Sequence, residues 1–288
     1  MKPASQPRHV WRWVRHASAT HEDAWRERLA FLGAQNVAVL GRPGTSMIRI
    51  EAYSPSAAPL RDVMHLFGGA VTRIDTEAIV AKANSPRKPL RLGRNMAILD
   101  THDRWPGNRP KPRVLLRIGS AMAFGTGDHA TTSSCLRFLR EEAPRLPAGW
   151  TALDIGTGSG ILALAAEKLG ASCVTAFDYD PRAVRAAQDN VRRNRCTRVS
   201  LAVMDVHAWR PGRKRHPLIM ANLFSNLLRA AAPRIVRALS PGGTLILSGI
   251  LRAQENETLA PFLSRGLVLE KAGRRGKWVT LLLHAPRR

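Results

Sequence analysis

The chain has 288 residues, 44% of them hydrophobic, which predicts one large globular domain and a smaller one. No apolar run approaches the roughly 20 residues that span a bilayer. The N-terminus lacks the apolar stretch of a secretory signal, and the three cysteines are scattered without a C-x-x-C pair, so we expect a cytoplasmic protein with no membrane span, disulfide framework or zinc site.

The first 75 residues alternate between strand-like and helix-like patterns. Residues 10–16 (VWRWVRH) alternate apolar and polar side chains, as a half-buried strand does. The expected strands are 10–16, 36–40, 47–52 and 70–74, the expected helices are 22–32 and 56–67, and a turn is expected at 41–44. The order βαββαβ predicts a ferredoxin-like α+β domain. Trp11 and Trp13 are candidates either for stacking on RNA bases or for packing in the core.

Residues 76–121 are rich in Pro, Arg and Gly and are interpreted as a connector. A short helix is expected at 76–83, and the strands 92–99 and 113–118 would lead into the large domain. Basic residues are concentrated here, because residues 86–117 hold nine basic and two acidic side chains. Residues 182–216 hold ten basic and two acidic ones. The overall charge of +24 and these clusters favour contact with RNA or with a ribosome. Solvent-exposed, arginine-rich surfaces without such a partner would produce the same charge pattern.

Strands and helices alternate from residue 124 onward, which predicts an α/β domain with a parallel sheet covered on both faces. The expected strands are 151–155, 173–178, 199–204, 218–222, 244–248, 266–271 and 277–285. The expected helices are 131–142, 160–169, 181–194, 224–239 and 254–263. Only residues 272–276 separate the last two strands, so we expect a hairpin and therefore one antiparallel strand in the sheet.

A glycine turn joins the first of these strands to its helix. It reads Leu153-Asp154-Ile155-Gly156-Thr157-Gly158-Ser159-Gly160, and the next strand ends at Asp178. Glycines let a ligand approach the backbone, and an acid at that strand end can accept hydrogen bonds from both ribose hydroxyls. The third glycine comes one residue too early for the dinucleotide pattern. We therefore expect a cofactor with a ribose but no pyrophosphate, and S-adenosylmethionine is the leading candidate.

Four polar or glycine positions fall at the carboxyl ends of predicted strands. They are Gly156, Asp178, Asp205 and Asn222. Because ligands of doubly wound sheets bind at that edge, these residues are expected to converge. Asp205 is interpreted either as an acceptor for the adenine amino group or as a helix cap. Asp180, followed by Pro181, is expected to be an N-cap.

Five segments together resemble the PrmA family, the S-adenosylmethionine-dependent methyltransferases of ribosomal protein L-eleven. They are AFGTGDHATT (123–132), LDIGTGSGILALAA, FDYDPRAV, MANLF and LSGIL (247–251). The resemblance covers residues 86–288 well and the first 75 residues loosely. It implies a class I methyltransferase domain at 122–288 and a substrate-recognition domain at 1–75, joined by the connector at 76–121.

Carried over by position, the resemblance gives roles to individual residues. Asp178 would hold the ribose, Gly156 and Gly158 would let the methionine part approach the backbone, and Thr132 would offer its hydroxyl to the carboxylate. Asn222 would lie near the methyl group as the catalytic residue. Phe124, Thr126 and His129 complete the implied cofactor site, with His129 as a hydrogen-bonding group of the loop or as a base.

The implied activity is methylation of amines, on lysine side chains or the N-terminus, of a ribosomal protein such as L-eleven. Asn222 is followed by Leu223-Phe224, where the family has Ile-Leu. Adenine methyltransferases carry Asn/Asp-Pro-Pro-Tyr/Phe there, so an RNA methyltransferase is the alternative that the basic clusters keep open. A non-catalytic RNA-binding module is a second alternative, against which the intact glycines and acids argue.

Overall fold

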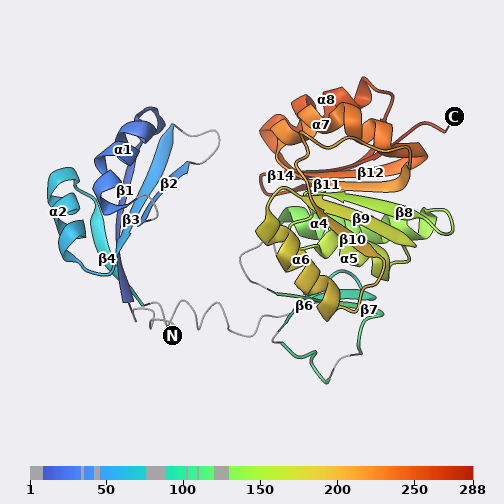
Figure 1. Cartoon of the computed structure of the whole chain (residues 1–288), viewed down its shortest axis with the longest axis horizontal. Helices are drawn as coiled ribbons and strands as arrows, with labels where there is room; N and C mark the ends of the chain where they lie inside the picture. The colour runs from blue at the N-terminus through green and yellow to red at the C-terminus, as the bar shows by residue number, and fades with distance from the viewer. Residues whose placement is uncertain are drawn as a thin grey trace. The chain divides into compact units, whose positions relative to one another are not determined.

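The computed structural model describes residues 9–33, 36–41, 46–75, 89–101, 103–108, 110–119 and 130–287. The chain divides into two compact units, Met1–Ser85 and Pro86–Arg288 (Figure 1). Among the described residues, none of the helices has the length and hydrophobicity needed to span a bilayer. The turn expected at 41–44 falls mostly outside the described residues, and the helix expected at 76–83 falls wholly outside them.

The smaller unit has its elements in the order that the sequence predicts. They are β1 (His9–Ser18), α1 (Glu22–Arg28), β2 (Val37–Gly41), β3 (Met47–Ser54), α2 (Ala58–Phe67) and β4 (Ala70–Asp75). The sheet order is β2-β3-β1-β4, and every neighbouring pair is antiparallel. This strand order is that of a ferredoxin-like sandwich. Helix α1 connects β1 to β2 with β3 between them in the sheet, and α2 connects β3 to β4 with β1 between them.

Trp13 lies at the centre of the smaller unit's core. Its side chain is fully buried, its Nε1 donates to the backbone oxygen of Gly68 at 2.8 Å, and its ring packs 6.2 Å from that of Trp25. Gly69 must be small, because a Cβ there would lie 2.6 Å from the backbone oxygen of Val14. Of the two interpretations of Trp13, core packing is therefore correct.

Much of the expected connector belongs to the larger unit. Its strands β5 (Leu90–Arg91), β6 (Met96–Asp100) and β7 (Val114–Ile118) form a small sheet of their own. Met96, Ile98, Leu116 and Ile118 are buried in the same hydrophobic core as the helices that cover the main sheet. The boundary predicted at residue 122 was wrong for this reason, since residues 89–119 pack as part of the larger unit rather than linking two units.

The main sheet of the larger unit has seven strands and is covered on both faces. The strands are β8 (Thr151–Ile155), β9 (Cys173–Asp178), β10 (Val199–Val203), β11 (His216–Asn222), β12 (Leu239–Leu251), β13 (Val268–Arg275) and β14 (Trp278–His284). The helices are α4 (Ala130–Glu142), α5 (Ile161–Lys168), α6 (Pro181–Arg193), α7 (Ser225–Ala238) and α8 (Glu255–Leu263). In Figure 1, α7 and α8 cover one face, and α4, α5 and α6 cover the other.

The strand order places a crevice in the middle of this sheet. The order is β10-β9-β8-β11-β12-β14-β13, and only β14 runs antiparallel to its neighbours, which confirms the predicted single antiparallel strand. The order reverses between β8 and β11, and at such a point the helices diverge to opposite faces. The carboxyl ends of β8, β9, β10 and β11 are therefore open to a ligand.

Candidate functional site

A cavity of about 670 Å³ lies at the carboxyl ends of these four strands. Its lining includes six of the residues that the sequence singled out, which are Thr132, Gly156, Gly158, Asp178, Asp205 and Asn222. The structure thus brings these six predicted residues together. Phe124, Thr126 and His129 lie outside the described residues.

The glycine turn wraps tightly against the neighbouring strands. The N–H groups of Gly156 and Thr157 both donate to the backbone oxygen of Phe177, at 2.9 and 3.0 Å. Gly156 has φ +71°, and a Cβ there would lie 2.3 Å from a methyl carbon of Leu223. Glycine suits this position because its φ lies in the left-handed region that side chains disfavour, and because a Cβ would displace the Leu223 side chain that follows β11.

Asp178 connects the glycine turn to the end of β9. Its Oδ2 accepts from Gly158 N at 2.9 Å and its Oδ1 from Asp180 N at 3.1 Å, and the residue is 8% exposed. A carboxylate has about four acceptor positions, so these two backbone bonds leave room for two more donors. The side chain is therefore fixed in direction and still able to accept from the two hydroxyls of a ribose.

The two other strand-end acids make local turns. Asp180 accepts from Arg182 N at 2.8 Å, which confirms it as the N-cap of α6, and hydrogen bonds from the Arg182 side chain and backbone lower the pKa of its carboxyl. Asp205 accepts from His207 N at 2.8 Å and so also stabilises the turn after β10. Asp205 lines the cavity together with Val206, so its two interpretations do not exclude each other.

Asn222 ends β11 with its amide directed at α4. Its Nδ2 donates to Thr132 Oγ1 at 3.4 Å, so the nitrogen is engaged, and the residue lines the cavity. The backbone that follows is closely packed, because Leu223 N donates to Ser248 O at 3.0 Å and a Cβ on Gly249 would lie 2.4 Å from Leu223 O. The amide is therefore held by its neighbours on both sides.

Asp154 is a buried acid that the sequence reasoning did not single out. It is 1% exposed beneath the glycine turn, and Thr157 Oγ1 donates to its Oδ2 at 2.6 Å. Its Oδ1 has no hydrogen-bond partner within the described part of the chain. Burial raises the pKa of this carboxyl to about 7, although the Thr157 hydrogen bond opposes the shift. A charged residue inside an otherwise apolar strand was the signal that could have identified it.

Aromatic side chains also line the cavity, and of these the sequence reasoning missed Tyr179 and Trp278. Tyr179 and Phe224 line it and are 75% and 61% exposed, and Trp278 of β14 lines it as well. Tyr179 directly follows Asp178, and Phe224 follows Asn222 by two residues. Their positions next to strand-end polar residues were the available signal. Exposed aromatic rings at a cavity mouth suit contact with a flat or aliphatic ligand group.

A cluster of His and carboxylate groups lies away from the cavity lining. Ligand atoms of Glu142, Glu270 and His284 lie within 4.8 Å of one another. Arg145 donates to Glu142 at 2.8 Å and approaches Glu270 at 3.4 Å. Because the Arg145 guanidinium already pairs with both carboxylates, this arrangement is interpreted as an ion-pair network.

Comparison with known proteins agrees with this geometry. The model of the family described as "Ribosomal protein L11 methyltransferase (PrmA)" matches residues 51–286. The chain belongs to this family. The ribosomal protein L11 methyltransferase of Pelobacter propionicus is 41% identical over 199 residues, which are 68% of this chain and 62% of that protein. That of Janthinobacterium sp. is 31% identical over an alignment that covers 95% of this chain and 96% of the relative.

A solved structure supports the same assignment. The crystal structure of ribosomal protein L11 methylase from Lactobacillus delbrueckii subsp. bulgaricus is similar with a TM-score of 0.62 and 28% identity, covering 70% of this chain and all of that one. The larger unit therefore has the class I methyltransferase fold, and the family's cofactor is S-adenosylmethionine. For some relatives the alignment covers less than two thirds of the relative's own length, as for the Pelobacter propionicus protein, of which it covers 62%.

The cavity fits this cofactor. Asp178 offers a carboxylate where a ribose would lie, and the turn at Gly156 has no room for a side chain, as a closely approached backbone requires. The volume of about 670 Å³ lies within the range of roughly 300–1,000 Å³ that is usual for small-molecule sites.

Proposed function

We propose that this protein transfers methyl groups from S-adenosylmethionine to amines of ribosomal protein L11, on lysine side chains or the N-terminus. The observation that carries the proposal is that the Asn222 amide, anchored through its nitrogen on Thr132, lines the same cavity as Asp178 and the glycine turn. Family membership supports the protein substrate over nucleic acid. Leu223-Phe224 in place of two prolines supports the same choice.

The cavity residues that the sequence singled out have positioning roles in this proposed reaction. The cofactor supplies a methyl group bonded to a positively charged sulfur. The neutral thioether that this sulfur becomes after transfer is an excellent leaving group. Asp178 would accept from the ribose hydroxyls of the bound cofactor, and the Gly156–Gly158 backbone would accommodate its methionine part. Thr132, which accepts from Asn222, would donate its hydroxyl hydrogen to the cofactor carboxylate. The carbonyl oxygen of Asn222 would accept an N–H of the substrate amine and so orient the amine for transfer.

The amine must be neutral before it can attack. An unperturbed lysine has a pKa of about 10.4. An ammonium would be disfavoured inside the cavity, because apolar groups such as Leu223, Phe224 and Trp278 line it and the bound cofactor would add a positive charge. Both effects lower the pKa of the amine, so the proton leaves to solvent before transfer and no strong protein base is needed.

Labelled cofactor tests the substrate class directly. Purified protein is incubated with S-adenosylmethionine labelled on its methyl group, and with ribosomal proteins and ribosomal RNA as separate fractions. The proposal expects label in a protein of the size of L11, absent from an Asn222→Ala reaction. Label found only in the RNA fraction would overturn the protein substrate.

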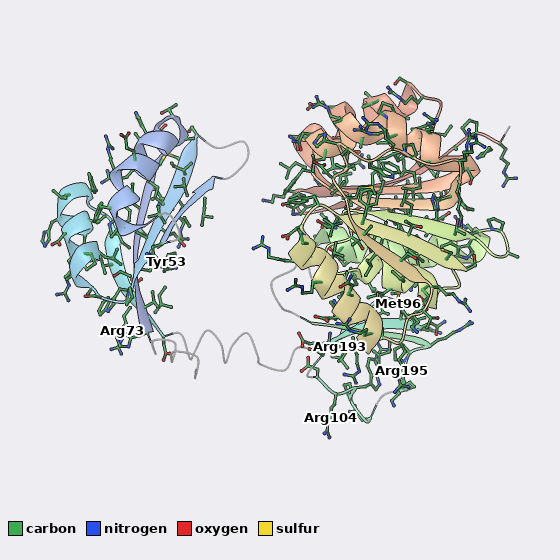
Figure 2. All side chains as sticks on the ribbon, viewed as in Figure 1. Tyr53, Arg73, Met96, Arg104, Arg193 and Arg195 are labelled. Carbon is green, nitrogen blue, oxygen red and sulfur yellow. The ribbon has the colours of Figure 1, made fainter. Side chains whose placement is uncertain are left out.

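The smaller unit is proposed to recognise the protein substrate. Both of its helices pack on the face of the sheet that carries Trp13, and the opposite face bears Arg12, Arg49, Glu51 and Tyr53. Glu51 is only 6% exposed because Arg49 pairs with it at 2.7 Å and Tyr53 donates to it. Figure 2 labels Tyr53 on this sheet. A sheet face that no described helix covers, and that carries ordered charges, is suited to docking another protein.

The proposal also places the protein in the cytoplasm and includes a contact with RNA or the ribosome. The net charge of +24 supports such a contact, because a strongly basic protein concentrates near polyanions. Local acidic side chains, rather than the overall charge, would then attract a basic ribosomal protein.

A further inference from the structure

The two basic clusters of the sequence meet in the structure. The side chain of Asn194, just after α6, accepts from Arg117 N and donates to Arg117 O, both at 2.7 Å, as a neighbouring strand would. Asn190 of α6 adds a bond from Gly119 N at 3.2 Å. Figure 2 shows Arg193 and Arg195, at the end of α6, close to the small sheet whose loop carries Arg104. Residues some 77 positions apart thus form one surface.

This surface has a large excess of positive charge. We call it the basic face, and it consists of the described residues of 89–119 together with 188–198. Its basic side chains are Arg91, Arg94, Arg104, Lys111, Arg113, Arg117, Arg192, Arg193, Arg195 and Arg198, against Asp100, Asp103 and Asp189. Asp189 contacts Arg192. The neighbouring Glu167 holds the backbone N–H groups of Thr197 and Arg198, so it fixes the end of this surface.

An arginine-rich composition alone does not explain the basic face. On the opposite edge of the larger unit, basic side chains lie next to acids. Lys271 pairs with Glu141, Arg274 with Glu255, and Arg145 with Glu142. A surface that only needed solvation would be expected to show the same mixture of signs. The basic face departs from it, with ten basic side chains against three acidic ones.

We infer that the basic face binds the phosphate backbone of RNA. Arginine predominates over lysine, and its planar guanidinium donates to phosphate oxygens in pairs. Arg91 lies 5.8 Å over the ring of Trp105, so an aromatic ring stands among the cations, as in surfaces that bind single-stranded RNA. The inference deepens the proposed contact with RNA and rests on the proposed function only in taking ribosomal RNA as the natural source.

The basic face does not overlap the cofactor cavity. Helix α6 contributes Arg182, Ala183 and Ala186 to the cavity lining and ends at Arg193 on the basic face, and Ala186 and Arg192 are six residues, or about 9 Å, apart along the helix. RNA bound there would leave the cavity open to a protein substrate. The contact would hold the enzyme near ribosomal particles without using its catalytic residues.

Matched variants of the full-length protein test the inference. The first carries Arg104→Gln, Arg113→Gln, Arg192→Gln and Arg198→Gln, all exposed positions on the basic face. The control carries Arg213→Gln, Arg215→Gln, Arg237→Gln and Arg265→Gln, which are exposed and lie outside it. Both lose four positive charges. Binding of a fluorescein-labelled single-stranded oligoribonucleotide is measured by anisotropy over a salt series, with poly-glutamate as competitor.

The basic-face variant is expected to bind the RNA at least about tenfold more weakly at about 0.1 M salt, with the slope of log K against log salt reduced by about 3. The control should stay within about threefold of wild type. Equal losses of RNA affinity in the two variants would show that net charge alone determines binding. If poly-glutamate displaces the labelled RNA as well as unlabelled RNA does, the site binds any polyanion. Either result overturns the inference. Methylation of isolated L11 is measured in parallel for wild type and both variants. If wild type does not methylate L11, the proposed function fails, whatever the result of the RNA-binding assay.

Discussion

Replacement of Asp178 by asparagine tests the cofactor cavity with little change in shape. The carboxylate holds Gly158 N and Asp180 N and is proposed to accept from two ribose hydroxyls. Asparagine is neutral and keeps one acceptor oxygen, so one ribose hydroxyl loses its acceptor and the other keeps only an uncharged one. A hydrogen bond to a charged group is worth about 1.5–3 kcal/mol, so the Kd for S-adenosylmethionine should rise about 10- to 150-fold.

Titration calorimetry with S-adenosylmethionine and S-adenosylhomocysteine measures this change. Both should weaken alike, because they share the ribose. Asp180→Asn is the matched control, since Asp180 lines the same cavity but caps α6 and holds Arg182. Asparagine is also a good N-cap, so the control should bind within about threefold of wild type. If Asp178→Asn also binds within threefold while remaining folded by circular dichroism, the ribose does not lie at Asp178 and the placement of the cofactor fails.

Four further changes have defined outcomes. Asn222→Ala should lower kcat about 100-fold at saturating cofactor with little change in cofactor Kd, and full turnover would remove Asn222 from the reaction. Gly156→Ala should destabilise the fold by about 1–3 kcal/mol in urea unfolding, because its Cβ would lie 2.3 Å from Leu223 at φ +71°; an unchanged midpoint would contradict this packing. The raised pKa of Asp154, about 7 against its usual 3.8, contributes stability that is present below about pH 4 and lost as pH rises through 7. Between pH 5 and 8, the free energy of unfolding of wild type should therefore fall by about 2–3 kcal/mol relative to that of Asp154→Asn. If the two proteins show parallel curves of unfolding free energy against pH, Asp154 ionises normally. Deletion of residues 1–75 should preserve cofactor affinity and abolish methylation of the protein substrate, whereas loss of cofactor binding would show that the larger unit depends on the smaller one.

The predicted site could be assembled from the sequence because parallel strands share one direction. The strands 151–155 and 173–178 were predicted with their observed bounds, since each is a short apolar run that ends at a glycine or an acid. Once the strands were placed, their carboxyl ends had to meet at one edge of the sheet. Gly156, Asp178, Asp205 and Asn222 therefore converged without any knowledge of contacts.

Features that depend on distant contacts were not predictable in this way. The segment at 89–119 has the Pro, Arg and Gly of a linker, yet Met96 and Leu116 are buried against helices. Strand β12 extends to Leu239–Leu251, beyond the expected 244–248, and its pairing with β14 shifts register between Leu247 and Ile250. The burial of Asp154 likewise follows from helices and strands packed around it. Local periodicity contains no information about such contacts.

The distribution of charge is compatible with the proposed basic protein substrate. Among the described residues, the cavity lining contains Asp178, Asp180 and Asp205 against one arginine, Arg182, whose side chain is paired with Asp180. A lysine of the proposed substrate would therefore meet a locally acidic lining, although the whole chain carries +24. The basic face adds a net +7 of this charge, and its nearest α6 arginine, Arg192, lies six residues or about 9 Å beyond Ala186, the last α6 residue of the lining. Because this is about one Debye length at physiological salt, the exposed charge of Arg192 is partly screened from the cavity, and the acids of the lining oppose what remains, so the proposed binding of RNA and of a basic protein to one enzyme is electrostatically compatible.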